Sequence, residues 1–214
     1  MKNGKEIYYY IASSLAMLVP VPGRFAYGIF VIVLFNIQMV LISMLVHGIE
    51  KLNLSVLKNA IISLTLIAIT ILYKQILTLI CPIAALTLGF CIYLPALTSA
   101  VIEFFFSDYE KGMKKHLAVT LKKSSKLSAC VLVYYLLRDL IGYGTLTLPS
   151  WKTLFVLHLP YNPESTQASM FMATIPGSLV FIAILLTFYI IYRKKMEIYR
   201  NSKEASSEAS GEEK

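Results

Sequence analysis

Long apolar runs separated by short polar stretches dominate the chain. Most of these runs approach or exceed the roughly 20 residues that an α-helix needs to cross a hydrocarbon core of about 30 Å. With 57% hydrophobic residues and a mean hydropathy of +0.67, the chain has the composition of an all-α membrane protein. The pattern predicts six membrane segments, at Ile7–Val19, Phe25–Val46, Val56–Ile80, Ala84–Phe106, Leu127–Leu137 and Phe171–Tyr192.

Proline interrupts two of the six segments. Ile7–Val19 supplies only about 20 Å of helix before it ends at Pro20 and Pro22. In Ala84–Phe106, Pro95 stands at the centre and small residues follow it. A broken helix in lipid needs neighbouring protein or a wet cavity to satisfy the freed backbone groups. Such breaks often mark a binding site in transporters, whereas the simpler interpretation of Pro95 is a kinked helix.

Division of the chain after Cys81 gives two halves of three segments each, residues 7–81 and 82–193, and each half begins with an interrupted segment. An odd number of segments makes the halves run in opposite directions. We therefore expect one domain over residues 1–200, built as two inverted three-helix repeats with broken first and fourth helices. The polar composition of residues 201–214 predicts a disordered cytoplasmic tail. The candidate site residues near the midplane are Pro20, Pro95, Thr98, Ser99 and Glu103.

Charge predicts the orientation. The net charge is +8, and the basic residues flank the apolar segments. Six crossings place both termini on one side, together with the loops that hold most of the lysines, including the basic amphipathic stretch Lys111–Lys126. By the positive-inside rule, both termini are cytoplasmic and the chain is a multi-pass protein of the cytoplasmic (inner) membrane. The same arrangement favours a lipid bilayer over nucleic acid as the partner.

Several further residues have a candidate role. Arg138 and Asp139, at the end of the fifth segment, predict an ion pair at the membrane boundary. Glu103 either pairs with cytoplasmic lysines or stays buried as a cation or proton site. The Pro-rich stretch Thr145–Gln167 reads as a loop. The cysteines lack CxxC spacing, and no nucleophile–base pair or phosphate loop occurs, so we predict neither a metal site nor catalytic residues. These cysteines are Cys81, Cys91 and Cys130.

Three stretches resemble the six-span integral subunits of the Rnf-type electron-transport complex and of the sodium-pumping NADH:quinone oxidoreductase (the Rnf/Nqr family). Ile92-Tyr93-Leu94-Pro95 resembles an I-Y/F-I-P-L segment in the family's fourth span. Residues 137–146, LRDLIGYGTL, resemble its I-R-E-I-L-G-x-G-T-L. Leu18-Val19-Pro20 falls where the family has L-C-P. The Arg-Asp…Gly-x-Gly-Thr match is the most specific and indicates the RnfE/NqrD-like branch.

The resemblance implies a partner and a cofactor. Family members work as opposed pairs of paralogous six-span subunits, within a complex whose flavin subunits exchange electrons. Two cysteines of each member hold an iron–sulfur (2Fe–2S) cluster between the pair. Here Val19 and Val101 occupy the ligand positions, and valine cannot ligate iron. Cys91, one turn before Pro95, is the alternative, as a ligand shifted from the family's position. The family's glycine-rich run in the fifth span is also replaced, by Lys122-Lys123-Ser124-Ser125-Lys126, which implies a changed packing partner.

We therefore expect a divergent, non-catalytic subunit of an ion-translocating redox complex, without cluster ligands of its own. Two alternatives stay open. One is a six-span substrate-binding or transport subunit for a small molecule or ion, which would use the midplane cavity at Pro20, Pro95, Thr98 and Ser99. The other is a structural membrane adaptor that works through Lys111–Lys126.

Overall fold

Within the part of the chain that the structure describes, four helices are long and apolar enough to cross a membrane. The computed structural model describes residues 14–52, 54–106, 113–150, 153–158 and 171–209. The candidate spans are Phe25–Ile49, Lys58–Ile80, Pro82–Phe105 and Ile175–Met196. The chain is therefore a mostly helical, multi-pass membrane protein, and four of the six predicted segments are confirmed as helices of spanning length.

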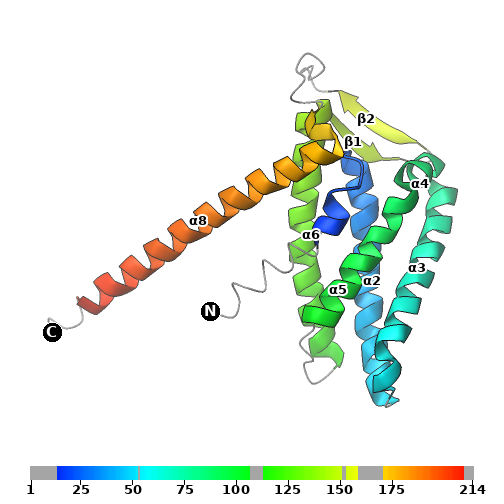
Figure 1. Cartoon of the computed structure of the whole chain (residues 1–214), viewed down its shortest axis with the longest axis horizontal. Coiled ribbons are helices and arrows are strands. Elements are labelled where there is room, and N and C mark those ends of the chain that lie inside the picture. The colour runs from blue at the N-terminus through cyan, green and yellow to red at the C-terminus, as the bar shows by residue number, and fades with distance from the viewer. Residues whose placement is uncertain (1–13, 53, 107–112, 151–152, 159–170, 210–214) are drawn as a thin grey trace.

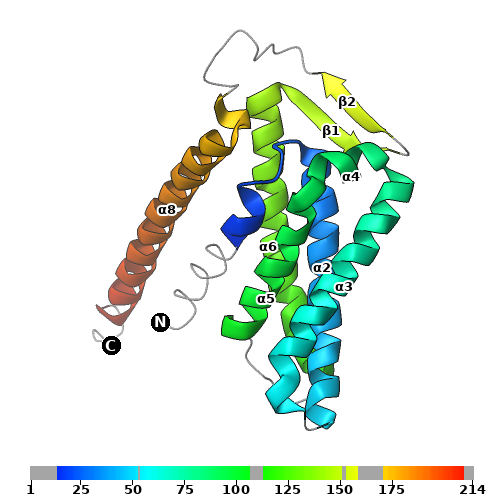
Figure 2. The same ribbon diagram turned by 45° about the vertical axis from the view of Figure 1, so that its right-hand side comes forward.

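A bundle of helices carries a small sheet across one end (Figure 1). Its members are α2 (Phe25–Lys51), α3 (Lys58–Ile80, preceded by the 3-10 turn η1, Ser55–Leu57), an interrupted helix and α6 (Met113–Tyr143). The interrupted helix consists of α4 (Pro82–Leu88), the 3-10 segment η2 (Gly89–Tyr93) and α5 (Leu94–Phe106). A last helix, α8 (Ile175–Ala209), begins near the sheet and diverges from the bundle in both ribbon views (Figures 1 and 2). It includes residues 201–209 of the segment whose composition predicts disorder.

α6 is one continuous helix of 31 residues. The sequence pattern divides this region into a basic surface helix, Lys111–Lys126, and a short span, Leu127–Leu137, but the structure joins them from Met113 onwards. No proline and no glycine occurs before Gly142 in α6, so nothing in the chain interrupts the hydrogen-bond ladder. At 1.5 Å per residue the helix is about 46 Å long, which exceeds the thickness of a hydrocarbon core.

α6 runs antiparallel to α2. Near the sheet, the carboxylate of Asp139 accepts a hydrogen bond from the backbone N–H of Phe25 (3.2 Å). About three turns further along α2, Asn36 Nδ2 donates to Ser128 Oγ (2.8 Å). Asn36 lies near the middle of the span Phe25–Ile49. The part of α6 around Ser128 therefore lies at the mid-depth of the bundle.

The fourth membrane segment is broken at Gly89, six residues before the proline that suggested the break. Gly89 adopts a left-handed φ of 47° and begins the 3-10 segment η2. Pro95 is the second residue of α5, where its missing N–H costs no intrahelical hydrogen bond. Gly89 therefore ends α4 and Pro95 starts the next helix. The break of the first segment is where we expected it: residues 14–18 are helical and Val19–Pro20 form a turn, while residues 7–13 lie outside the described part.

The stretch predicted as a loop contains a β-hairpin, which corrects the all-α expectation. β1 (Thr145–Pro149) pairs antiparallel with β2 (Leu154–His158). Leucine and threonine alternate along β1, and β2 contains phenylalanine and valine, all residues that favour strands. Gly144, with a φ of 61°, turns the chain from α6 into β1. Residues 159–170 of the predicted loop lie outside the described part.

Gly28 allows the close approach of α2 and α6. A Cβ atom at this position would lie 2.4 Å from Cδ2 of Tyr135, whose hydroxyl is bonded to the carbonyl of Met17 (3.0 Å). Because Tyr135 is anchored and fully buried, we expect Gly28→Ala to destabilise the protein by about 1–3 kcal/mol. Thermal unfolding in detergent measures this change.

Gly48→Ala is the matched control on the same helix, since a Cβ there meets nothing within 4 Å. We expect it to be neutral or to stabilise α2 by up to about 1 kcal/mol. Equal melting temperatures for the two variants would contradict the proposed Gly28–Tyr135 packing.

Candidate functional site

The two interrupted segments meet inside the bundle. The thiol of Cys91, in η2, lies 3.4 Å from the carbonyl oxygen of Pro20 and donates to it. These residues belong to different predicted halves of the chain. The first break and the 3-10 segment of the fourth membrane segment are therefore in direct contact.

Side chains from other elements bind four successive or nearly successive carbonyls of the first break. Proline has no N–H and cannot continue the helical ladder, so carbonyls here need other donors. In a membrane, water does not supply them. The donor–acceptor pairs are Tyr135 Oη to Met17 O (3.0 Å), Ser178 Oγ to Val19 O (3.3 Å), Cys91 Sγ to Pro20 O (3.4 Å) and Arg138 Nη1 to Val21 O (2.8 Å). Three elements, α6, η2 and α8, thus hold one segment of main chain.

Arg138 connects this break to the start of α8. Its side chain is 1% exposed, and its Nη2 donates to the carbonyls of Ala173 (3.0 Å) and Thr174 (3.4 Å). These carbonyls belong to another irregular point, just before Pro176 in α8. The planar guanidinium can bind carbonyls on two segments at once, which a lysine ammonium does less well. Gly23 makes room for it, because a Cβ there would lie 2.7 Å from Arg138 Nε.

Asp139 binds N–H and O–H groups at the beginning of α2 and in β1. Oδ2 accepts from the backbone N–H of Phe25 (3.2 Å) and from both the N–H and the hydroxyl of Thr147 (2.8 Å each). Oδ1 accepts from the hydroxyl of Thr145 (3.1 Å). A carboxylate is favourable at a helix N-terminus, where N–H groups lack intrahelical partners. Asp139 therefore caps α2 and fixes the hairpin on top of it.

Arg138 and Asp139 do not act as the simple ion pair that we expected. The hydrogen bonds of the two side chains lead to different groups: carbonyls for the arginine, N–H and O–H donors for the aspartate. The reason is helical geometry, since adjacent residues of a helix point about 100° apart and do not face each other. In the Arg-Asp…Gly-x-Gly-Thr motif, Arg138, Asp139 and Thr145 thus each form hydrogen bonds through their side chains. Gly144 turns the chain between them.

The midplane candidates on α5 lie on its buried side. Ser99 donates to Gln38 Oε1 (3.1 Å), and Gln38 Nε2 donates to Thr70 Oγ1 (2.9 Å). Ser99, Gln38 and Thr70 are fully buried, so α2, α3 and α5 are joined by a polar contact within the apolar bundle. Thr98 is also fully buried and Glu103 is 4% exposed. Pro95 is buried beside them, and its carbonyl lies 2.8 Å from Ser99 Oγ.

Sequence reasoning missed several of these partners. Tyr135, Ser178 and Thr147 read as ordinary members of a span or loop, and only their buried hydroxyls reveal their function. Thr70 lies in an apolar run of the sequence, and nothing there indicates that it bonds Gln38 of another helix. A hydroxyl that can bond its own helix backbone gives no indication from sequence of whether it also bonds another helix.

The residues at the family's cluster positions do not fit an iron–sulfur group. Val19 and Val101 have no atom that binds iron, and both side chains are only partly buried. Val19 takes part through its carbonyl, not its side chain. Over the described part of the chain, no group of three or more His, Cys, Asp and Glu side chains is placed to hold a metal ion.

Comparison with known proteins gives no match: the chain matches no family model, no curated protein and no solved structure.

Exchange of Arg138 and Asp139 tests their separate contacts. We expect Arg138→Asp and Asp139→Arg each to reduce the yield of folded protein strongly, because each leaves buried groups unpaired at a cost of about 3–5 kcal/mol. The double variant should be no better than the worse single one. Size-exclusion chromatography of the detergent-solubilised protein measures the yield. Recovery in the double variant would show that the two charges mainly pair with each other.

Arg24→Met is the control for a charge lost at the same end of the bundle. Arg24 lies over the ring of Tyr143 at 5.3 Å, and we expect its loss to cost about 1 kcal/mol or less.

Variants at Cys91 separate a hydrogen-bonding role from a ligand role. Cys91→Ser keeps a donor for the Pro20 carbonyl, whereas Cys91→Ala leaves that carbonyl unbonded and should destabilise the protein by about 1 kcal/mol relative to serine. Cys130→Ala, at an exposed cysteine, should leave the melting temperature of the purified chain unchanged. Loss of a visible chromophore in both Cys91 variants, without a difference in stability, would contradict the hydrogen-bonding role.

Proposed function

We propose that this chain is a divergent, non-catalytic membrane subunit of an ion-coupled electron-transport complex of the Rnf/Nqr type. The observation that carries the proposal is the contact between the two interrupted segments, Cys91 Sγ to Pro20 O. Family resemblance predicts an interruption in each half, and inverted repeats form sites where two broken helices meet. Here the junction lies towards the hairpin end of the bundle, beside Tyr135 and Arg138 of α6.

The proposal includes a six-crossing arrangement. α6 is too rich in lysine to count as a span by composition, but it lies antiparallel along α2 from Asp139 to Ser128, and a neighbour of a spanning helix over that length crosses with it. The first segment, which ends at Pro20, would complete six. The chain then descends through the fourth segment after ascending through the first, which is the relation that an inverted repeat requires.

The orientation follows from charge. Lys51 and Lys58 lie at the end of the bundle away from the hairpin, where α2 ends and α3 begins. The hairpin and Arg24 lie at the other end. We assign the lysine-rich end to the cytoplasm and the hairpin to the outer side of the inner membrane.

The proposed role of the chain is that of a structural scaffold within the complex. With valine at positions 19 and 101, this chain supplies no iron ligand at those positions, so no electron-transfer step is assigned to it. Its contribution would be to hold a paralogous, cluster-bearing subunit and the flavin subunits in place. The anchoring of the break by Arg138, and of α2 by Asp139, supports a rigid role of this kind.

Purification of the tagged full-length chain from its own membranes tests the proposal. We expect flavin-carrying subunits and a second six-span subunit to co-purify, with the absorbance of flavin and of an iron–sulfur cluster in the complex. Mass spectrometry and visible spectroscopy provide the readouts. A complex without any redox subunit would overturn the proposal. A tightly bound small molecule in its place would favour a transport or substrate-binding subunit.

A further inference from the structure

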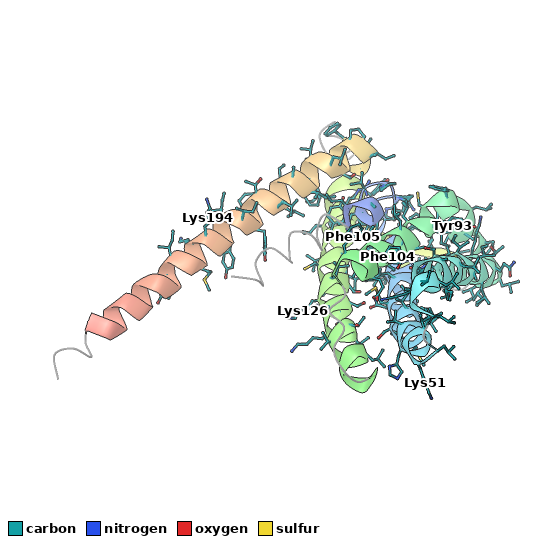
Figure 3. The ribbon with its side chains drawn as sticks, turned by 60° about the horizontal axis from the view of Figure 1, so that its bottom comes forward. Lys51, Tyr93, Phe104, Phe105, Lys126 and Lys194 are labelled. Atoms are coloured by element: carbon teal, nitrogen blue, oxygen red, sulfur yellow. The ribbon has the colours of Figure 1, made fainter. Side chains whose placement is uncertain are left out.

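Two exposed lysines lie in the central part of α6. Ser124 Oγ and Ser128 Oγ are both bonded to the side-chain amide of Asn36, at 2.5 and 2.8 Å. Because Asn36 is close to the centre of the α2 span, Lys126 lies at about mid-depth, and Lys122 lies one helical turn towards the lysine-rich end. Both side chains are exposed. Figure 3 shows Lys126 on the side of α6 that is turned away from the rest of the bundle.

α3 shows what a lipid-facing surface looks like at the same depth. The hydrogen bond between Gln38 and Thr70 places Thr70 level with the centre of α2. From residue 67 to residue 72, the exposed residues of α3 are all apolar: Ile67 (51%), Ala68, Ile71 (43%) and Leu72 (59%). The exposed face of α6 is different. From residue 122 to residue 130 its exposed residues are Lys122, Ser125, Lys126, Ala129 and Cys130, which we call the lysine face. Exposed Leu121 and Val133 flank it at either end.

Contact between the lysine face and lipid tails is energetically unfavourable. A lysine at the centre of a membrane helix is unfavourable, and such residues normally face protein or water. From the middle of a hydrocarbon core about 30 Å thick, the headgroups are about 15 Å away, beyond the reach of a lysine stem. Lys126 therefore requires a polar partner that the described part of the bundle does not place over it.

We propose that the lysine face is covered in the membrane by a transmembrane helix of a different protein, which places a carboxylate opposite Lys126. Ser125 and Ala129, one turn apart on this face, are small enough to let a neighbouring helix approach closely. A carboxylate within the interface would be paired and shielded from lipid, and it would select this partner over uncharged helices.

A second copy of this chain is the wrong partner for this face. Symmetric pairing would bring lysines against lysines, and like charges in an interface are strongly unfavourable. The acids within the candidate spans and α6 are Glu103 and Asp139, and both are buried in their own bundle. The inference does not depend on the proposed electron-transport role, because it rests only on depth, exposure and charge.

Site-specific photo-cross-linking in the native membrane identifies what covers the face. A benzophenone amino acid at Ala129 should form an adduct with another membrane protein whose spanning segment contains Asp or Glu. The same probe at Leu72, at similar depth on α3, should react with lipid or not at all. Adducts at Ala129 with a second copy, with residues 1–13 of the same chain, or with lipid alone would overturn the proposal.

Charge variants then test the pairing itself. Lys126→Arg should keep the partner, Lys126→Met should reduce its recovery about tenfold, and Lys126→Glu should reduce it further. Exchange of the partner's carboxylate for lysine should restore binding to Lys126→Glu. Monodisperse elution of each variant in detergent serves as the folding control. If Lys126→Glu does not fold, Lys126→Met decides, and unchanged recovery of the partner with Met would overturn the proposal.

Discussion

The carbonyl groups of Met17, Val19, Pro20 and Val21 lie inside the bundle at a point where the main chain cannot bond to itself. In water such groups would be solvated, but within a membrane protein each unbonded carbonyl costs free energy comparable to a lost hydrogen bond. Side chains from α6, η2 and α8 satisfy them. Elements distant in sequence must therefore be in position before the break is stable. The interruption determines the packing of the bundle as much as the apolar surfaces do.

Two adjacent residues of α6, Arg138 and Asp139, bind the unpaired backbone groups of opposite helix ends: carbonyls in one case and an N–H group in the other. The guanidinium of Arg138 binds carbonyls of the first break and of the segment before α8, where the partial charge is negative. The carboxylate of Asp139 binds the first N–H of α2, where it is positive. Because successive side chains on a helix diverge, one short stretch of α6 can serve both. The glycine and threonine that follow are then understandable, since Gly144 reverses the chain and Thr145 returns to the same carboxylate.

The sequence allows part of this arrangement to be predicted, and the limits have physical causes. Long apolar runs identify the four spans because lipid imposes length and composition on each helix separately. Pro20 and Pro22 identify the first break because proline acts locally. In the fourth segment, Gly89 and Pro95 act in sequence, one ending a helix and the other starting the next, so the proline alone gives the wrong position. The lysines of α6 led to the prediction of a surface helix and a separate short span. A polar composition indicates which residues are exposed, but not where a helix begins or ends.

The site was harder to predict because its contacts depend on tertiary structure. Opposite charges at neighbouring positions of the sequence, Arg138 and Asp139, suggest an ion pair. In the helix the two side chains point in different directions and bind different groups. Buried hydroxyls such as those of Tyr135 and Ser178 have the same sequence context as lipid-facing ones. Ser99 could be selected through its position after Pro95, but its partners Gln38 and Thr70 come from two other helices.

The same contacts show which atoms of the first break the fold depends on. Val19 is held through its carbonyl oxygen, which any residue at that position supplies, and Cys91 holds Pro20 through a thiol outside the ligand positions. A change of the side chain at position 19 therefore leaves the hydrogen-bond pattern of the break intact. The residues that the fold cannot spare are those that donate to the carbonyls, above all Arg138. The integrity of the break thus depends on main-chain atoms of this segment and on the side chains that bind them, and not on the side chain of Val19.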